Sequence, residues 1–215
     1  MTDMGAANGP DGEPDDWREL PQSLHARFLT GDFAGGLAFV AAVGALSEHT
    51  DHHPALTLTP THVDVRLPSP GSPGVTDADR ELARRISSLA REHEVVSRPA
   101  VTTVIELALD TADVAAVGPF WAALLTGDAG ALDGDDVVDP TGRMPLLWFQ
   151  HTEPHATPRQ RFHLDVWVPH DTAAGRIAAA VAAGGRVVDA TQAPSFTVLA
   201  DAEGNRACVC TMLGR

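Results

Sequence analysis

The sequence predicts an α+β protein made of two units that join near residues 94–100. Three observations lead to this prediction. Segments with apolar residues at helical spacing are mixed with short segments in which apolar and polar residues alternate. Before residue 94 the order is helix, two strands, helix, whereas after residue 100 the order strand, helix, three strands occurs twice. A chain of 215 residues is also long enough for two domains of about 100 residues each.

The composition excludes several classes of partner. The formal net charge is −14, and because phosphate contacts need clustered lysine and arginine, we expect neither nucleic acid nor membrane as a partner. The two cysteines are too few for a disulfide framework. Residues 1–16 lack the basic flank and apolar stretch of a signal peptide, and their composition is typical of a disordered lead-in. We therefore expect a cytoplasmic protein.

The first unit begins with a helix. Phe39, Val43 and Leu46 recur at helical spacing in DFAGGLAFVAAVGALSEH, and Asp32 can cap the N-terminus of this helix. A short strand around residues 27–29 is expected before it.

Two strands and a second helix complete the first unit. The segments LTLT and VDVRL alternate apolar with polar residues, which predicts a strand pair. After the proline-rich loop PSPGSPG, the segment TDADRELARRISSLAREH carries a helical apolar stripe. Thr76 and Asp79 have the spacing of a capping box at the start of this second helix.

The second unit repeats one pattern. VTTVIELAL predicts a strand, a helix is expected from Asp113, and shorter strands are expected near residues 135–139 and 146–150. RFHLDVWV then begins the same order again, with a helix over residues 171–183 and strands at GRVVDA, SFTVLA and RACVCTML.

Matching positions in the two halves favour an internal duplication. Glu106 and His163 lie at equivalent points of the two first strands. Gln150 and Cys208 lie near the ends of the two last strands, and their separation along the chain is nearly the same as that of the first pair. Nearly equal offsets at both ends are expected of a repeated unit.

The segment SEHTDHHPALTL concentrates histidine, the side chain that most readily exchanges protons near pH 7. His52 and His53 are adjacent, so on an extended backbone they point to opposite sides and are poor joint metal ligands. They could serve separate tasks, one binding and one transferring protons. They could equally be exposed turn residues, with His49 complementing the C-terminus of the preceding helix.

The stretch from about residue 17 to residue 90 resembles pterin-4a-carbinolamine dehydratase. The resemblance rests on the first helix, on D-H-H-P at residues 51–54, on VDVRL, and on G-V-T-D-A-D-x-x-L-A at residues 74–83. It implies a small antiparallel sheet with helices on one face, over residues 17–93, and assembly as dimers or tetramers.

The resemblance implies a hydro-lyase that removes water from 4a-hydroxytetrahydropterin, such as the tetrahydrobiopterin form, to give the quinonoid dihydropterin. This chemistry needs an acid for the departing hydroxyl and a base for a ring proton. His52 and His53 match the family's H-H-P histidines, and Asp79 matches its acidic residue, although Asp79 could equally serve only as a helix cap. The third family histidine falls on Pro70, which cannot exchange protons, so we expect an impaired site.

Residues 101–215 resemble the glyoxalase-like domains of the vicinal oxygen chelate superfamily. The resemblance rests on L-D-T-A-D…F-W-A-A-L-L, W-F-Q, R-F-H-L-D-V and D-A-E-G-N. It implies two β-α-β-β-β modules that curl around a cleft, in which metal-dependent members bind a divalent ion. Residues 94–100 would be the linker between this domain and the first.

The resemblance places four residues of this chain in the ligand cleft, namely Glu106, Gln150, His163 and Cys208. Glu106 and His163 suit a divalent ion, but Gln150 is a neutral oxygen donor and Cys208 replaces the usual glutamate. We therefore expect no metal or other cofactor. Zinc held by Cys208 and Cys210 stays open, as does a purely structural role for His163 and Cys208.

Three functions follow from these resemblances. The leading one is dehydration of a pterin substrate by the first unit, and the alternative is a non-catalytic protein that binds a small molecule in the glyoxalase-like cleft. The third is a metal-dependent lyase or dioxygenase in the second unit. We also expect a homodimer or larger homo-oligomer, because about 75 ordered residues make a marginal core. Three helix glycines, Gly35, Gly36 and Gly44, would permit close packing.

Overall fold

The computed structural model divides into two units, Met1–Thr102 and Thr103–Arg215. The structure describes residues 15–21, 23–50, 52–68, 72, 74–126, 128–142, 144–154, 162–182, 184–200 and 206–215. Pro70 and nearly all of the expected lead-in over residues 1–16 lie outside the described residues.

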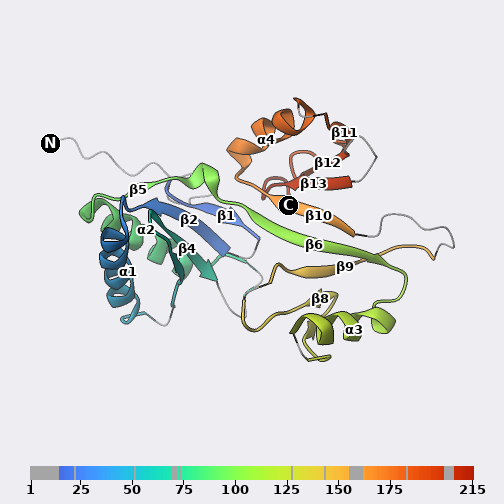
Figure 1. Ribbon diagram of the computed structural model, residues 1–215, viewed down its shortest axis with the longest axis horizontal. Coiled ribbons are helices and arrows are strands. Elements are labelled where there is room, and N and C mark those ends of the chain that lie inside the picture. The colour runs from blue at the N-terminus through green and yellow to red at the C-terminus, as the bar shows by residue number, and fades with distance from the viewer. Residues whose placement is uncertain are drawn as a thin grey trace. The chain divides into compact units, whose positions relative to one another are not determined.

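The first unit is a five-stranded antiparallel sheet with two helices on one face (Figure 1). Its strand order is β1-β2-β4-β3, and β5 pairs with the end of β2 that β1 leaves free. The elements in chain order are β1 (Arg18–Leu20), β2 (Ser23–Leu29), α1 (Phe33–Ser47), β3 (Ala55–Leu58), β4 (His62–Pro68), α2 (Asp77–Glu92), β5 (Val96–Ser97) and the 3₁₀ helix η1 (Pro99–Val101).

The core of the first unit lies between the sheet and its helices. Alternate positions of β2 and β4 are apolar, and they pack against the buried stripes of α1 and α2. The glycine at position 36 allows α1 to approach β3, because a Cβ there would lie 2.5 Å from Leu58 Cδ1. The main core residues are Leu24, Ala26, Phe28, Phe39, Val43, Val63, Val65, Leu67, Leu82 and Ile86.

The edges of the first sheet differ from the sequence-based expectation. Residues 94–100, expected to be a linker, contain β5 and the beginning of η1, and β5 pairs with β2 at Phe28 and Leu29. The strand expected at residues 27–29 begins earlier, at Ser23, and β1 precedes it. The strands β1 and β5 have three and two residues, too few for an alternation to be recognised.

The second unit is an eight-stranded mixed sheet in the order β11-β12-β13-β10-β6-β9-β8-β7. The first half contains β6 (Val104–Thr111), α3 (Val114–Thr126), β7 (Leu132–Asp133), β8 (Asp136–Val137) and β9 (Leu147–His151). The second half contains β10 (Phe162–Trp167), α4 (His170–Ala182), β11 (Arg186–Asp189), β12 (Phe196–Ala200) and β13 (Arg206–Cys210). The two halves therefore share the predicted order strand, helix, three strands (Figure 1).

The register of the sheet relates the two halves. The central strands β6 and β10 are antiparallel, and Leu107 lies directly opposite Leu164, its counterpart in the second half. In the parallel pairs, Leu107 faces Leu147 and Leu164 faces Ala207, so Leu147 and Ala207 are equivalent positions of the two last strands. Gln150 lies three residues after Leu147, and Cys210 lies three residues after Ala207, so Gln150 corresponds to Cys210. The predicted equivalence of Gln150 with Cys208 is therefore shifted by two residues.

The two faces of β6 and β9 have different surroundings. Leu109, Leu147 and Phe149 are buried and pack against α3. The alternate positions point to the opposite face, where polar residues gather. In the described part of the chain, no helix has the length and apolar character that crossing a membrane requires.

Candidate functional site

The first candidate site lies where the turn after α1 meets the beginning of α2. Thr50 holds this turn: its backbone nitrogen donates to Ser47 O over 2.9 Å. Its hydroxyl lies 2.9 Å from Ser47 O and 2.8 Å from His52 O. The backbone that carries His52 is therefore tied to the last turn of α1.

Asp79 takes part both in the N-terminal cap of α2 and in the candidate site. Its Oδ2 accepts hydrogen bonds from Thr76 N over 2.6 Å and from Thr76 Oγ1 over 2.7 Å, and its backbone nitrogen donates to Thr76 Oγ1. These bonds form the capping box of α2. The other oxygen, Oδ1, lies 2.5 Å from His52 Nε2, and the Asp79 side chain is fully buried. One carboxylate thus caps the helix and pairs with a histidine.

The structure separates the two adjacent histidines. His52 has 18% of its side chain exposed and pairs with Asp79, whereas His53 is exposed. His49 is exposed as well, and the C-cap residue of α1 is Glu48, whose backbone nitrogen donates to Gly44 O.

The pair of His52 and Asp79 has the arrangement of a proton-transfer couple. A carboxylate next to an imidazole fixes the orientation of the ring and stabilises its protonated form. The backbone and hydroxyl of Thr76 hold the carboxylate in place, so it needs no rearrangement when the imidazole gains a proton.

A second titratable group of the first unit, His25, was missed in the sequence. It lies on β2, on the sheet face away from the helices, and its Nε2 lies 3.0 Å from Ser23 Oγ. Burial, and after it the charge of Arg66, lowers the pKa of His25 to about 4. Its alternation with the core residues Leu24 and Ala26 was the signal that placed it on that face.

The second candidate site lies on the sheet face of the second unit that is turned away from α3. The strand register brings alternate residues of β6, β9, β10 and β13 to this face. They are Glu106, Asp110, Trp148, Gln150, His163, Asp165, Trp167, Cys208 and Cys210.

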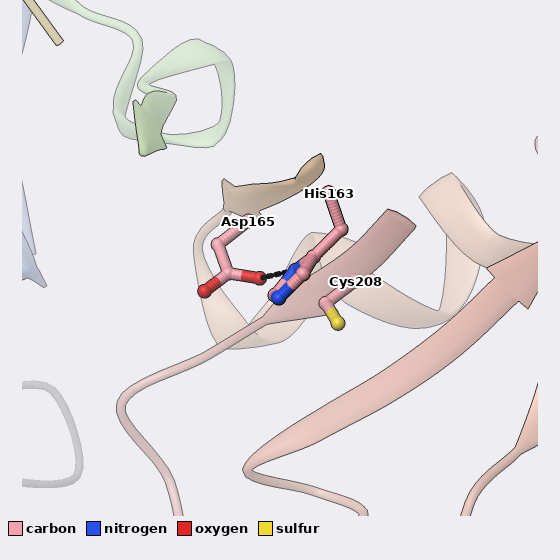
Figure 2. A group of neighbouring side chains, drawn as sticks. All are labelled: His163, Asp165 and Cys208. Atoms are coloured by element: carbon pink, nitrogen blue, oxygen red, sulfur yellow. Dashed lines mark ion pairs between the residues drawn. The ribbon is translucent and has the colours of Figure 1, made fainter. Parts of the chain in front are cut away.

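His163 is the centre of this cluster. Its Nδ1 lies 3.2 Å from Asp165 Oδ1 (Figure 2). Its Nε2 lies 2.9 Å from Gln150 Oε1 and 3.8 Å from Asp110 Oδ1. The ring also meets Trp148 edge to face, with the centroids 5.9 Å apart. The Asp165 carboxylate, and after it Cys208, raises the pKa of His163 to about 10. Both ring nitrogens thus face oxygen atoms, which favours the imidazolium.

Cys208 is the third member of the cluster. Ligand-capable atoms of His163, Asp165 and Cys208 all lie within 4.8 Å of one another (Figure 2). Both thiols are free, with Cys208 partly exposed and Cys210 buried. A hydrogen bond from Cys210, and the neighbouring His163, lowers the pKa of Cys208 to about 6. The contact with Cys208, together with burial, raises the pKa of Cys210.

The structure brings together three of the four residues expected in this cleft. Gln150, His163 and Cys208 meet, whereas the Glu106 carboxylate accepts a hydrogen bond from Trp167 Nε1 over 2.8 Å. Glu106 is buried, and this burial raises its pKa. Sequence reasoning missed Asp165, although its position two residues after His163 puts it on the same strand face.

The four expected positions do not fit the metal centre of the metal-dependent members. Glu106 is bound to Trp167, and Gln150 is bound to His163. Of the expected histidine, cysteine and carboxylate ligands, all among the described residues, only His163 and Cys208 belong to a group whose ligand-capable atoms lie within 4.8 Å of one another. We therefore derive no chemistry through a metal ion.

Comparison with known proteins identifies the first unit. The family model for pterin 4 alpha carbinolamine dehydratase matches residues 6–89. A Halobacterium salinarum protein named "Putative pterin-4-alpha-carbinolamine dehydratase" is 36% identical over 72 residues, covering 34% of this chain and 79% of that protein. A Thermosynechococcus vestitus protein of the same name is 35% identical over 74 residues, covering 34% of this chain and 78% of that protein.

The chain belongs to the pterin-4a-carbinolamine dehydratase family. The relatives match its N-terminal third, and this dehydratase domain is followed by a second domain. The family model for glyoxalase-like domains matches residues 106–210, so the second unit is a glyoxalase-like domain.

Two solved structures match the dehydratase domain over part of the chain. A transcriptional coactivator/pterin dehydratase from Brucella melitensis is 29% identical and covers 35% of this chain and 83% of its own, with a TM-score of 0.34. A pterin dehydratase-like protein described as a RuBisCO assembly factor in the alpha-carboxysome is 36% identical. It covers 35% of this chain and 89% of its own, with a TM-score of 0.32.

Proposed function

We propose that the dehydratase domain removes water from 4a-hydroxytetrahydropterin and releases the quinonoid dihydropterin, as a hydro-lyase. The observation that carries this proposal is the contact of 2.5 Å between His52 Nε2 and Asp79 Oδ1. It joins the two segments that carry the family resemblance, D-H-H-P and G-V-T-D-A-D. Membership of the family supports the assignment.

In this proposal the two histidines exchange protons with the substrate. One protonates the 4a-hydroxyl group, which leaves as water, and the other accepts a proton from the pterin ring. Asp79 positions His52 through its contact with the ring nitrogen Nε2. His53 is exposed, so a bound pterin can reach it from the solvent side.

A turnover assay tests the proposal. The 4a-hydroxytetrahydropterin is generated in the cuvette by an aromatic amino acid hydroxylase, and formation of the quinonoid product is followed by its absorbance. We expect the full chain to exceed the uncatalysed rate and His52→Gln to lower the catalysed excess roughly 10²- to 10⁴-fold. His49→Gln, which alters an exposed histidine in the same turn, is the matched control and should retain wild-type turnover. Equal rates with and without the protein would refute the proposal.

The missing third histidine gives a second arm of the same assay. Pro70 stands where the family resemblance expects a proton-transfer group, so Pro70→His should raise turnover roughly 10- to 100-fold. An unchanged rate would mean that the defect lies elsewhere in the pocket.

A second candidate function is small-molecule binding by the glyoxalase-like domain. The observation that favours it is the group of polar side chains on the sheet face turned away from α3. Ligand sites typically contain a few polar groups that converge on one place. A ligand of this face should raise the melting temperature of the wild type and lose that effect in Gln150→Ala.

A further inference from the structure

Cys208 lies beside a histidine that is surrounded by oxygen atoms. Asp165 Oδ1 faces one ring nitrogen of His163 at 3.2 Å, and Gln150 Oε1 faces the other at 2.9 Å. The carboxylate charge beside Nδ1 and the amide oxygen bonded to Nε2 both favour the protonated ring. The histidine therefore presents a fixed positive charge to Cys208, whose sulfur is within 4.8 Å of the ring.

The two thiols of the chain differ in their surroundings. Cys208 is partly exposed, so a small molecule can reach it, whereas Cys210 is 2% exposed. Cys210 follows two residues later on the same strand face and acts as a hydrogen-bond donor to Cys208. Cys208 thus has a cation and a thiol donor next to its sulfur, which are the features that stabilise a thiolate.

We propose that Cys208 is a nucleophilic thiolate, held by His163 and Asp165, that captures electrophilic carbonyl compounds as covalent adducts. The class of ligand is the conjugated carbonyl, because soft thiolates add to the β-carbon of such compounds. The site lies in the glyoxalase-like domain and does not depend on the dehydratase proposal.

The addition needs no oxidant or cofactor. The sulfur of Cys208 forms a bond to the β-carbon, and the electron pair of the carbon–carbon double bond moves toward the carbonyl group. The α-carbon then takes one proton from water. The net change is addition of the thiol across the double bond.

Charged groups on several strands face this site. They are Asp165 on β10, and Asp110 and Glu106 on β6, with Arg215 near the C-terminus acting on Glu106. The neutral, titratable thiol of Cys210 on β13 faces the site as well. Within the described residues, β9 contributes the neutral side chains Trp148 and Gln150, and β12 places Val198 opposite Cys208. The charge of Asp165 opposes the thiolate of Cys208, while its contact with His163 supports the cation. The contact with His163 and the hydrogen bond from Cys210 outweigh this opposition, and the pKa of Cys208 is lowered to about 6.

Alkylation of the full chain with N-ethylmaleimide tests the proposal. The chain has only two cysteines, so intact-mass spectrometry counts the adducts and peptide mapping assigns them. We expect one adduct, on Cys208, with a rate that rises with pH around a midpoint near 6. Buried Cys210 should react only after denaturation and serves as the internal control.

Variants show whether the reactivity of Cys208 comes from the charge of His163 or only from the exposure of the thiol. His163→Gln should move the midpoint up toward about 8.5, the ordinary value of a cysteine thiol. The rate at pH 6.5 should fall about 5- to 10-fold, because the gain in intrinsic nucleophilicity partly offsets the loss of thiolate. Cys210→Ser, which keeps a donor next to Cys208, should move the midpoint less than His163→Gln does.

A second measurement does not depend on how well His163→Gln folds. The ultraviolet absorbance of the thiolate, taken as the difference between the wild type and Cys208→Ser, should titrate at the same midpoint near pH 6. A midpoint of about 8.5 in the wild type, or labelling of both cysteines in the native protein, would overturn the proposal. So would one divalent metal ion per chain that blocks labelling until a chelator removes it.

Discussion

Each domain of this chain contains a histidine in contact with an aspartate. The two histidines differ in the oxygen atoms that face them. Asp79 is fixed by the capping box of α2, which leaves one oxygen for His52. His163 instead meets oxygen atoms of Asp165, Gln150 and Asp110, which come from three strands. One carboxylate at Nε2 fixes the orientation of His52, whereas several oxygen atoms around His163 favour a lasting positive charge.

Among the variants that test this comparison, removing the charge of Asp79 should produce the largest effect, which is a loss of dehydratase turnover. Asp79→Asn keeps the shape of the side chain but withdraws the anion from His52, so dehydratase turnover should fall roughly 100-fold or more. Thr76→Ala is the matched control, because it removes the hydroxyl that bonds Asp79 Oδ2 and leaves the carboxylate facing His52. This variant should cost about 1 kcal/mol of stability and lower turnover less than Asp79→Asn does, because the carboxylate keeps its charge and its bond from Thr76 N. An equal loss of turnover in both variants would assign Asp79 to the helix cap alone.

Acid should destabilise the first domain through His25. The pKa of His25 falls from 6.5 to about 4 on folding, so the unfolded chain binds this proton more tightly. Stability is therefore fully present above pH 6.5 and is lost as pH falls toward 4, by about 3 kcal/mol. Hydrogen exchange in β2 peptides measures this loss, and a His25→Gln variant should lose less stability over the same range. The same pH dependence in wild type and variant would contradict the assignment.

Alkali should destabilise the second domain through His163. Its pKa rises from 6.5 to about 10 on folding, so the stabilising effect is present below pH 6.5 and is lost as pH rises to 10. Solvent screens part of the interaction, and we expect a loss of about 1–2 kcal/mol. Hydrogen exchange in β10 peptides should show the loss in the wild type and a flatter profile in His163→Gln. If the variant followed the wild type, the charge of His163 would not be stabilising.

The last prediction concerns assembly and should affect neither histidine pair. We propose that the chain forms a homo-oligomer through the first domain. The sequence of α1 contains no charged residue, and Phe33 and Leu37 are 54% and 55% exposed. A second copy of the chain can cover this face, so light scattering should give at least twice the monomer mass of 22.6 kDa. Leu37→Glu should reduce that mass to the monomer, whereas a change at exposed Glu81 on α2 should not. A monomeric wild type would contradict the proposal.

The helices and long strands could be predicted because their periods extend over many residues. The capping box of α2 was visible in the spacing of Thr76 and Asp79. The contact between Asp79 and His52 was not, because it joins residues that are far apart in the sequence, and only the family resemblance pointed to it. The hydrogen bond of Glu106 could not be predicted either. It runs diagonally from β6 to Trp167 on the neighbouring strand β10. Strand alternation predicts the face on which a side chain lies, but not its hydrogen-bond partner.

The meeting of Leu107 with Leu164 gives the second domain the geometry of a two-fold symmetric pair. In a homodimer with such an axis, every side chain of this sheet face would occur twice. Here both halves belong to one polypeptide, so each position has been free to change independently of its counterpart. The place of Glu106 in one half holds His163 in the other, and the place of Ala108 holds Asp165. A cluster of His163, Asp165 and Cys208 can therefore exist on one side of the axis without a costly duplicate on the other.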